Sequence, residues 1–134
     1  MTGASGLARD VVALACAASA GIHAALAPAH FAEGRAAGVA FVASAGLLAV
    51  VAVEIRRPSD RVAPLAAVLV LGGLLASYVA ATTSGVPLVH PDPEPVDGLA
   101  LATKAIEAVG LLAALRVGAP ATRFHTPRTK GRLT

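Results

Sequence analysis

The chain has 134 residues, of which 56% are hydrophobic, and it carries a formal net charge of +3. Four apolar runs, each about as long as a bilayer is thick, occupy most of this length, and a soluble domain of this size could not bury them all. A single cysteine excludes an internal disulfide, and four membrane helices leave no room for a separate soluble domain.

The first predicted helix spans about residues 11–29 and follows Asp10, which we expect to be its N-cap. His23 is its ionisable residue, about 10 Å from the outer end at the helical rise per residue. Pro28 is expected to kink or end the helix. The triplet Ala18-Ser19-Ala20 also has the form of a signal-peptidase site, but the apolar run continues to residue 29, which favours a membrane span.

The second and third helices are predicted over about residues 36–55 and 62–81, joined by a short polar turn that contains Pro58. So short a turn makes these two helices antiparallel neighbours. The polar exception within the third run is Tyr78.

The fourth predicted helix spans about residues 98–115 and follows Asp97, its expected N-cap. Inside the span, Lys104 and Glu107 lie three residues apart and therefore share one helix face. Ionisable groups are costly in lipid and by default indicate function, so we expect this pair to face the bundle interior and line a water-accessible cavity. The alternative is a structural pair that neutralises itself and stabilises a kinked or polar helix surface. Under either interpretation the pair is expected to face the bundle interior.

The positions of Lys and Arg predict the orientation in the membrane, because basic residues concentrate on the cytoplasmic side. Nine of them fall in segments that share one side: Arg9, Arg56, Arg57, Arg61, Arg116, Arg123, Arg128, Lys130 and Arg132. The other two loops, residues 30–35 and 82–97, together hold only Arg35. We therefore expect both termini in the cytoplasm and these two loops outside. The same partition explains the net positive charge without a nucleic-acid partner.

The prediction is an all-α integral membrane four-helix bundle over residues 1–118, N-in/C-in, followed by a basic, disordered cytoplasmic tail over residues 119–134. The expected partners are the lipid bilayer and, as an alternative, other membrane subunits. Arg outnumbers Lys nine to two, and Asn, Gln and Trp are absent. That bias is typical of a GC-rich bacterial genome, so we expect a bacterial inner membrane protein.

The polar exceptions gather in the half of the membrane next to the two outer loops. The candidate ligand-binding or proton-relay residues are His23, Tyr78, Lys104 and Glu107. A divalent metal is a second interpretation, because imidazole and carboxylate groups suit Zn²⁺, Cu²⁺ or Ni²⁺. Its candidate ligands are His23, His30, Glu33 and His90. No spacing typical of two local metal ligands supports this second interpretation.

We expect a binding or accessory module with an outward-facing polar site formed by His23, Lys104 and Glu107. One alternative is a small transporter or proton-coupled component, in which the Lys104–Glu107 pair changes its charge state. Another is a structural subunit of a larger membrane complex. An enzyme is the function that the sequence favours least, because the Ser and Thr residues near Ser84 have no evident catalytic base.

Several short motifs carry a resemblance to a known group of proteins. They are the segment AGIHAALAPAHFAE at residues 20–33, SGVPL at residues 84–88, EPV at residues 94–96, and Glu107 in the last helix. With these motifs the chain resembles small uncharacterised four-span membrane proteins of actinobacteria. The resemblance implies the fold and the membrane location, and it adds no catalytic residue.

Overall fold

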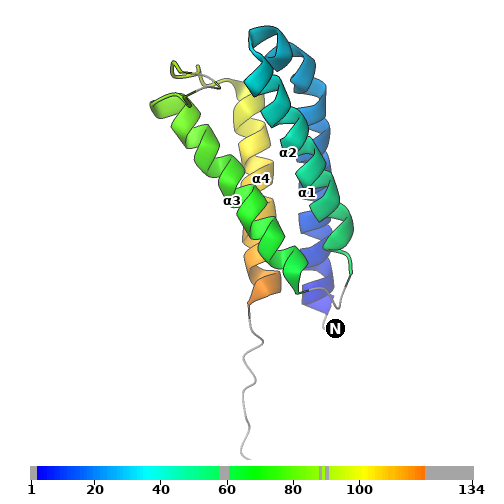
Figure 1. Ribbon diagram of the computed structural model, residues 1–134. Helices are drawn as coiled ribbons and strands as arrows, with labels where there is room; N and C mark the ends of the chain where they lie inside the picture. Colours follow the sequence, from blue (N-terminus) through cyan, green and yellow to red (C-terminus); the bar gives the residue numbers. More distant parts are fainter. Residues whose placement is uncertain (1–2, 58–60, 88, 90, 120–134) are drawn as a thin grey trace, which may run out of the picture.

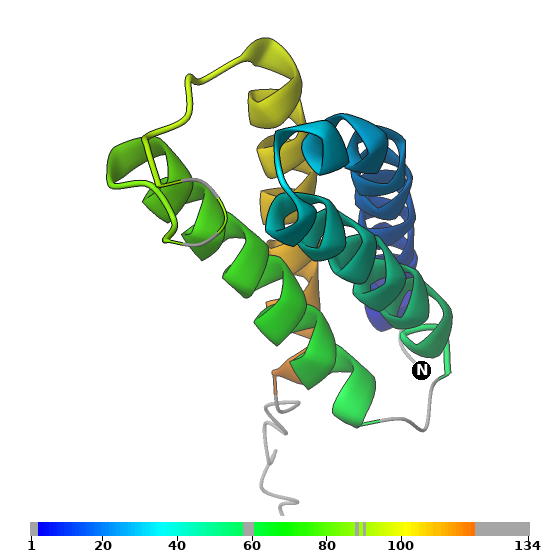
Figure 2. The same ribbon diagram turned by 45° about the horizontal axis from the view of Figure 1, so that its top comes forward.

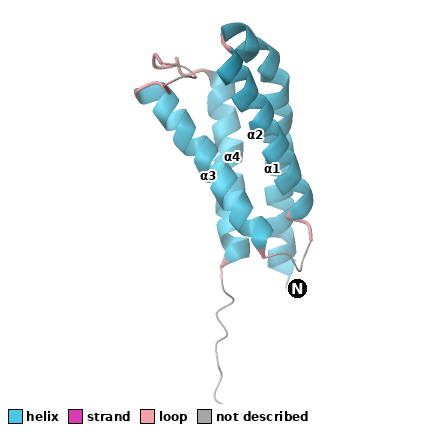
Figure 3. Ribbon diagram, viewed as in Figure 1, coloured by secondary structure: helices cyan, strands magenta, loops and turns pink. Residues whose placement is uncertain are grey.

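The computed structural model describes residues 3–57, 61–87, 89 and 91–119. Its helices are α1 (Gly3–Glu33), α2 (Arg35–Glu54), α3 (Val62–Thr83) and α4 (Gly98–Gly118) (Figure 1). Loops connect them and no sheet layer is drawn among the described residues (Figure 3). The all-α prediction is confirmed, and all four helices are long and apolar enough to cross a membrane. The predicted tail lies outside the described residues, apart from Ala119.

Helix α1 differs from its prediction at both ends. It begins at Gly3, so Asp10 is an interior residue and the predicted N-cap is wrong. Residues 3–9 contain no proline, and the carboxylate of Asp10 lies 3.5 Å from the guanidinium of Arg56 instead of capping the helix. The helix also continues through Pro28 to Glu33. A proline removes one backbone hydrogen bond, a loss that helices packed in a membrane bundle tolerate.

Helix α4 begins as predicted. The Asp97 carboxylate accepts a hydrogen bond of 2.8 Å from the backbone N–H of Ala100, which is the geometry of an N-cap. The cap fixes where the helix starts and therefore which way Lys104 and Glu107 face.

The four helices do not pack equally against one another. Helix α1 packs most extensively on α2 and then on α4, α3 packs mainly on α4, and the contact between α2 and α3 is smaller than any of these three. The predicted neighbours α2 and α3 lie close together at the end where Val62 begins α3. The distance between them grows along α3, so that its other end, at Thr83, lies away from α2 (Figures 1 and 2). The short connection holds only the adjoining ends of the two helices together.

The apolar core fills the end of the bundle near the N-terminus. Its largest fully buried apolar residues include Val12, Leu48, Ile55 and Leu71. Here α1 and α4 approach closely at Gly110, where an added Cβ would lie 2.8 Å from the Cβ of Ala15. A larger side chain would therefore force these helices apart.

The outer surface of the bundle is apolar. Leu14, Leu69 and Leu112 are 72%, 65% and 62% exposed, on α1, α3 and α4 respectively. Monomeric soluble proteins rarely expose contiguous apolar surface, whereas lipid tails accommodate it at no cost. Together with the four candidate spans, this surface suggests a multi-pass membrane protein.

Candidate functional site

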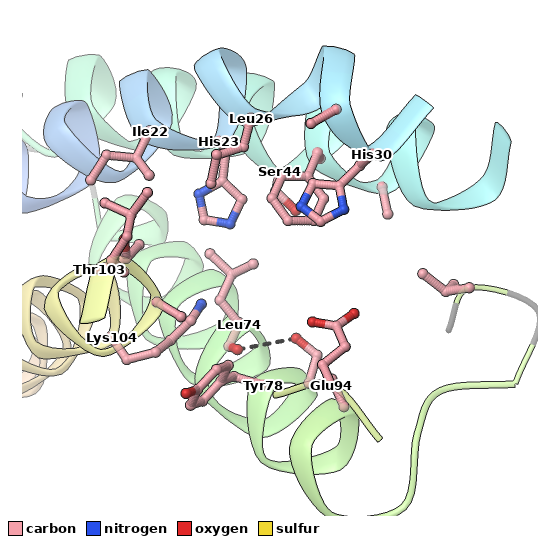
Figure 4. Close-up of a pocket in the computed structure, with 18 of the residues that line it drawn as sticks. Ile22, His23, Leu26, His30, Ser44, Leu74, Tyr78, Glu94, Thr103 and Lys104 are labelled. Atoms are coloured by element: carbon pink, nitrogen blue, oxygen red, sulfur yellow. Dashed lines mark hydrogen bonds between the residues drawn. The ribbon is translucent and has the colours of Figure 1, made fainter. Parts of the chain in front are cut away.

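A cavity of about 460 Å³ opens at the end of the bundle opposite the apolar core. It lies where α3 leans away from α2, and all four helices and the α3–α4 loop contribute to its wall. Ile22, Leu26 and Leu74 provide apolar surface, while His23 and Lys104 provide polar groups (Figure 4). The space is large enough for a small organic molecule.

The predicted pair on α4 forms an ion pair beside the cavity. The ammonium of Lys104 lies 2.7 Å from Oε2 of Glu107. The Lys104 side chain is 16% exposed and lines the cavity, whereas Glu107 is fully buried. The expectation that this pair faces the bundle interior is confirmed, but of its two members only Lys104 is among the residues that line the cavity. A carboxylate buried this deeply needs a hydrogen-bond or ion-pair partner for each of its oxygens. The partner of the second oxygen, Oε1, comes from another helix.

Ser19 on α1 is that partner. Its hydroxyl donates a hydrogen bond of 2.7 Å to Oε1 of Glu107, across 88 positions of sequence, and the serine is fully buried. Sequence reasoning did not identify Ser19 as part of the site. The available signal is its position one helical turn before His23, which puts both residues on the same face of α1.

His23 continues this network from Ser19 to the cavity. Its Nδ1 lies 2.9 Å from the backbone oxygen of Ser19 and 3.3 Å from the Ser19 hydroxyl oxygen. A carbonyl oxygen can only accept, so Nδ1 carries the proton, and Nε2 is the acceptor of the neutral ring. The side chain is only 6% exposed and lines the cavity, yet Nε2 has no hydrogen-bond partner among the described residues.

His30 lies on α1 seven residues after His23, nearer the cavity mouth. Because α1 continues through Pro28, His23 and His30 share the cavity face, as their seven-residue spacing predicts. The ring of His30 stacks on Phe41 of α2 at a centroid distance of 3.6 Å, and His23 lies 5.2 Å from the same ring. Nδ1 of His30 lies 2.8 Å from Oε2 of Glu33. Phe41 thus holds both imidazoles in place, a contact that the sequence analysis did not anticipate.

Tyr78 on α3 faces Lys104 across the cavity (Figure 4). The ammonium of Lys104 lies 5.6 Å from the centre of the Tyr78 ring, within the range of a cation–π contact. The Tyr78 hydroxyl is buried and has no hydrogen-bond partner in the part of the chain that the structure describes. Buried hydroxyls are normally paired, so this one is an exception among the buried polar atoms that the structure describes.

Carboxylates surround the cavity mouth. Glu33 lies at the end of α1, Asp97 caps α4, and Glu94 lies in the connecting loop. The loop turns after α3 at Gly85, which has a positive φ of 72°, and it folds back so that the backbone N–H of Glu94 donates to the carbonyl of Ala81 at 2.9 Å. This hydrogen bond fixes Glu94 in the cavity wall.

The structure brings only part of the predicted metal set together. His30 and Glu33 contact each other, and His23 lies on the same cavity face, but His90 is outside the described residues. Among the residues that are described, no three His, Cys, Asp or Glu side chains are grouped closely enough to hold a metal ion. The metal interpretation therefore stays a prediction.

No known protein family, curated protein or solved structure matches this chain. The resemblance to actinobacterial four-span proteins thus stays a prediction as well, and the function is argued from the geometry of the cavity.

Proposed function

We propose that this chain is a bacterial inner-membrane protein that binds a small ligand in the cavity between its four helices. Both termini lie in the cytoplasm in this proposal, so the cavity opens to the outer side. The observation that carries it is the acceptor atom Nε2 of His23, which belongs to a side chain only 6% exposed and has no partner among the described residues at the wall of a 460 Å³ cavity. An empty hydrogen-bonding position in a mostly apolar pocket is what a ligand site offers.

The packing favours binding over transport. The buried residues between the cavity and the opposite end of the bundle form an apolar cluster. All the buried polar side chains of the described residues belong to the part of the bundle around the cavity: Ser19, His23, Thr103 and Glu107. A carrier needs polar groups that continue toward the second opening, and the apolar cluster supports a site that is closed on that side. The proposal requires no catalytic group.

The test is saturable binding that depends on the cavity. The protein in lipid nanodiscs would be screened by ligand-observed NMR against a set of small amphipathic fragments. Leu26→Trp fills the cavity, and Leu69→Trp adds the same side chain at a lipid-facing position, where the native leucine is 65% exposed. We expect fragments whose binding is lost in Leu26→Trp and retained in Leu69→Trp. If every fragment responds equally to both variants, the signals report partition into lipid and the proposal fails.

A further inference from the structure

We infer that the ligand of this cavity is a protonated organic amine with an apolar body. This inference rests on the proposed binding function and names the class of molecule that the site selects. Three features of the wall lead to it: the state of Lys104, the acceptor on His23, and the charge at the mouth.

Lys104 is not available as a receptor for an anion. Its ammonium already pairs with Glu107 at 2.7 Å, and Glu107 is held in place by the Ser19 hydroxyl at the same distance. An anionic ligand would have to compete with a carboxylate that is fully buried and cannot move into water. Glu107 thus neutralises the charge of Lys104, the only lysine among the described residues of the wall.

The Nε2 atom of His23 is an acceptor that a ligand with a hydrogen-bond donor would satisfy. The Ser19 carbonyl fixes the proton on Nδ1, so the neutral ring presents the lone pair of Nε2 to the cavity. A carboxylate or a ketone brings only acceptors and would leave this cavity-facing acceptor without a donor. A protonated amine brings up to three donors, and a hydrogen bond from a charged donor is stronger than one from a neutral donor.

The mouth of the cavity favours a cation on entry. The carboxylates of Glu33, Glu94 and Asp97 line it, and Arg35, which begins α2 at the same end, does not belong to the wall. Glu33 contacts His30, Asp97 caps α4 and Glu94 has a partner as well, so all three groups are partly engaged, but their field still opposes an anion and attracts a cation. Ile22, Leu26 and Leu74 accommodate an apolar body deeper in the cavity.

The test compares three probes of nearly equal shape that differ in their head group: phenylbutylamine, phenylbutanol and phenylbutyrate. Affinities would be measured in nanodiscs at neutral pH for the wild type, the cavity-filling variant Leu26→Trp and the lipid-facing control Leu69→Trp. We expect the amine to bind most tightly and the carboxylate most weakly, with all specific binding lost in Leu26→Trp alone.

Two further variants test the atoms named here. His23→Phe keeps a ring beside Phe41 but removes the acceptor, and it should weaken amine binding by about tenfold or more, because a hydrogen bond to a charged group is lost. The same change should leave phenylbutyrate binding within a factor of about two. Glu94→Gln should weaken amine binding on the order of threefold, since it removes one mouth charge that is partly screened by water. Raising the salt concentration should reduce amine binding and leave phenylbutanol binding unchanged.

The possible results distinguish a failure of the amine class from a failure of the proposed binding function. If phenylbutanol or phenylbutyrate binds as tightly as the amine, and Leu26→Trp abolishes both, the cavity is a binding site but the amine class is wrong. If His23→Phe leaves amine binding unchanged, the role of Nε2 is wrong. If none of the three probes binds while other fragments do, the amine class is also overturned. If nothing binds in a manner sensitive to Leu26→Trp, the proposed binding function itself fails.

Discussion

The buried ion pair makes a prediction about stability that depends on which of its two charges is removed. Lys104→Met leaves the carboxylate of Glu107 fully buried without its counterion. Removing one partner of a buried pair costs about 3–5 kcal/mol, because the remaining charge is uncompensated. Glu107→Gln leaves an ammonium that is 16% exposed and lines the cavity, where water can solvate it, and the amide oxygen still accepts from Ser19. We expect that variant to cost only about 1–2 kcal/mol.

The double variant Lys104→Met/Glu107→Gln removes both charges and keeps the Ser19 hydrogen bond. It should be more stable than Lys104→Met alone, by about 2 kcal/mol, even though it carries one more substitution. The assay is reversible unfolding in mixed micelles by titration with sodium dodecyl sulfate, followed by far-ultraviolet circular dichroism. Arg35→Met, which removes an exposed charge away from the cavity wall, is the control and should change the free energy of unfolding by less than about 0.5 kcal/mol.

Equal costs for the two single variants, with a double variant that costs their sum, would refute this reasoning. That result would mean that Glu107 is solvated in the membrane-embedded protein and that the two charges act independently. An unusually stable Lys104→Met variant would refute it as well.

Two other predictions test the packing and the orientation of the bundle. Gly110→Ala should destabilise the protein by about 1–3 kcal/mol in the same unfolding assay, because the new Cβ would lie 2.8 Å from the Cβ of Ala15. Gly73→Ala, which meets nothing within 4 Å, should be neutral or stabilising, and equal effects of the two changes would contradict the close approach. For the orientation, a cysteine introduced by Ser84→Cys should react with a membrane-impermeant maleimide added to intact cells, whereas one introduced by Arg57→Cys should react only after permeabilisation. The reverse pattern would place the cavity on the cytoplasmic side.

The helices follow from local properties of the sequence. An apolar run that crosses a bilayer must pair its own backbone groups, and a helix is the arrangement in which one segment can do so. The pairing of Lys104 with Glu107 is equally local, since three residues along a helix bring two side chains to one face. The N-cap at Asp97 is also a local feature, because its partner Ala100 is only three residues away in the sequence. The local rule failed at Asp10, where nothing in the preceding described residues stops the helix and Arg56, two residues past the end of α2, contacts the carboxylate.

The composition of the site, in contrast, depends on how the helices pack. Ser19 meets Glu107 across 88 positions because α1 and α4 approach at Gly110, and Phe41 meets both histidines because α2 folds back on α1. The cavity exists because α3 leans away from α2, an angle set by the side-chain volumes of four helices together. The sequence by itself determined the helices, the polar residues they carry and the end of the bundle where those residues lie. Only the tertiary structure decided which charge is buried, which is exposed to the cavity and which acceptor is left open, because these depend on contacts between segments that no local pattern specifies.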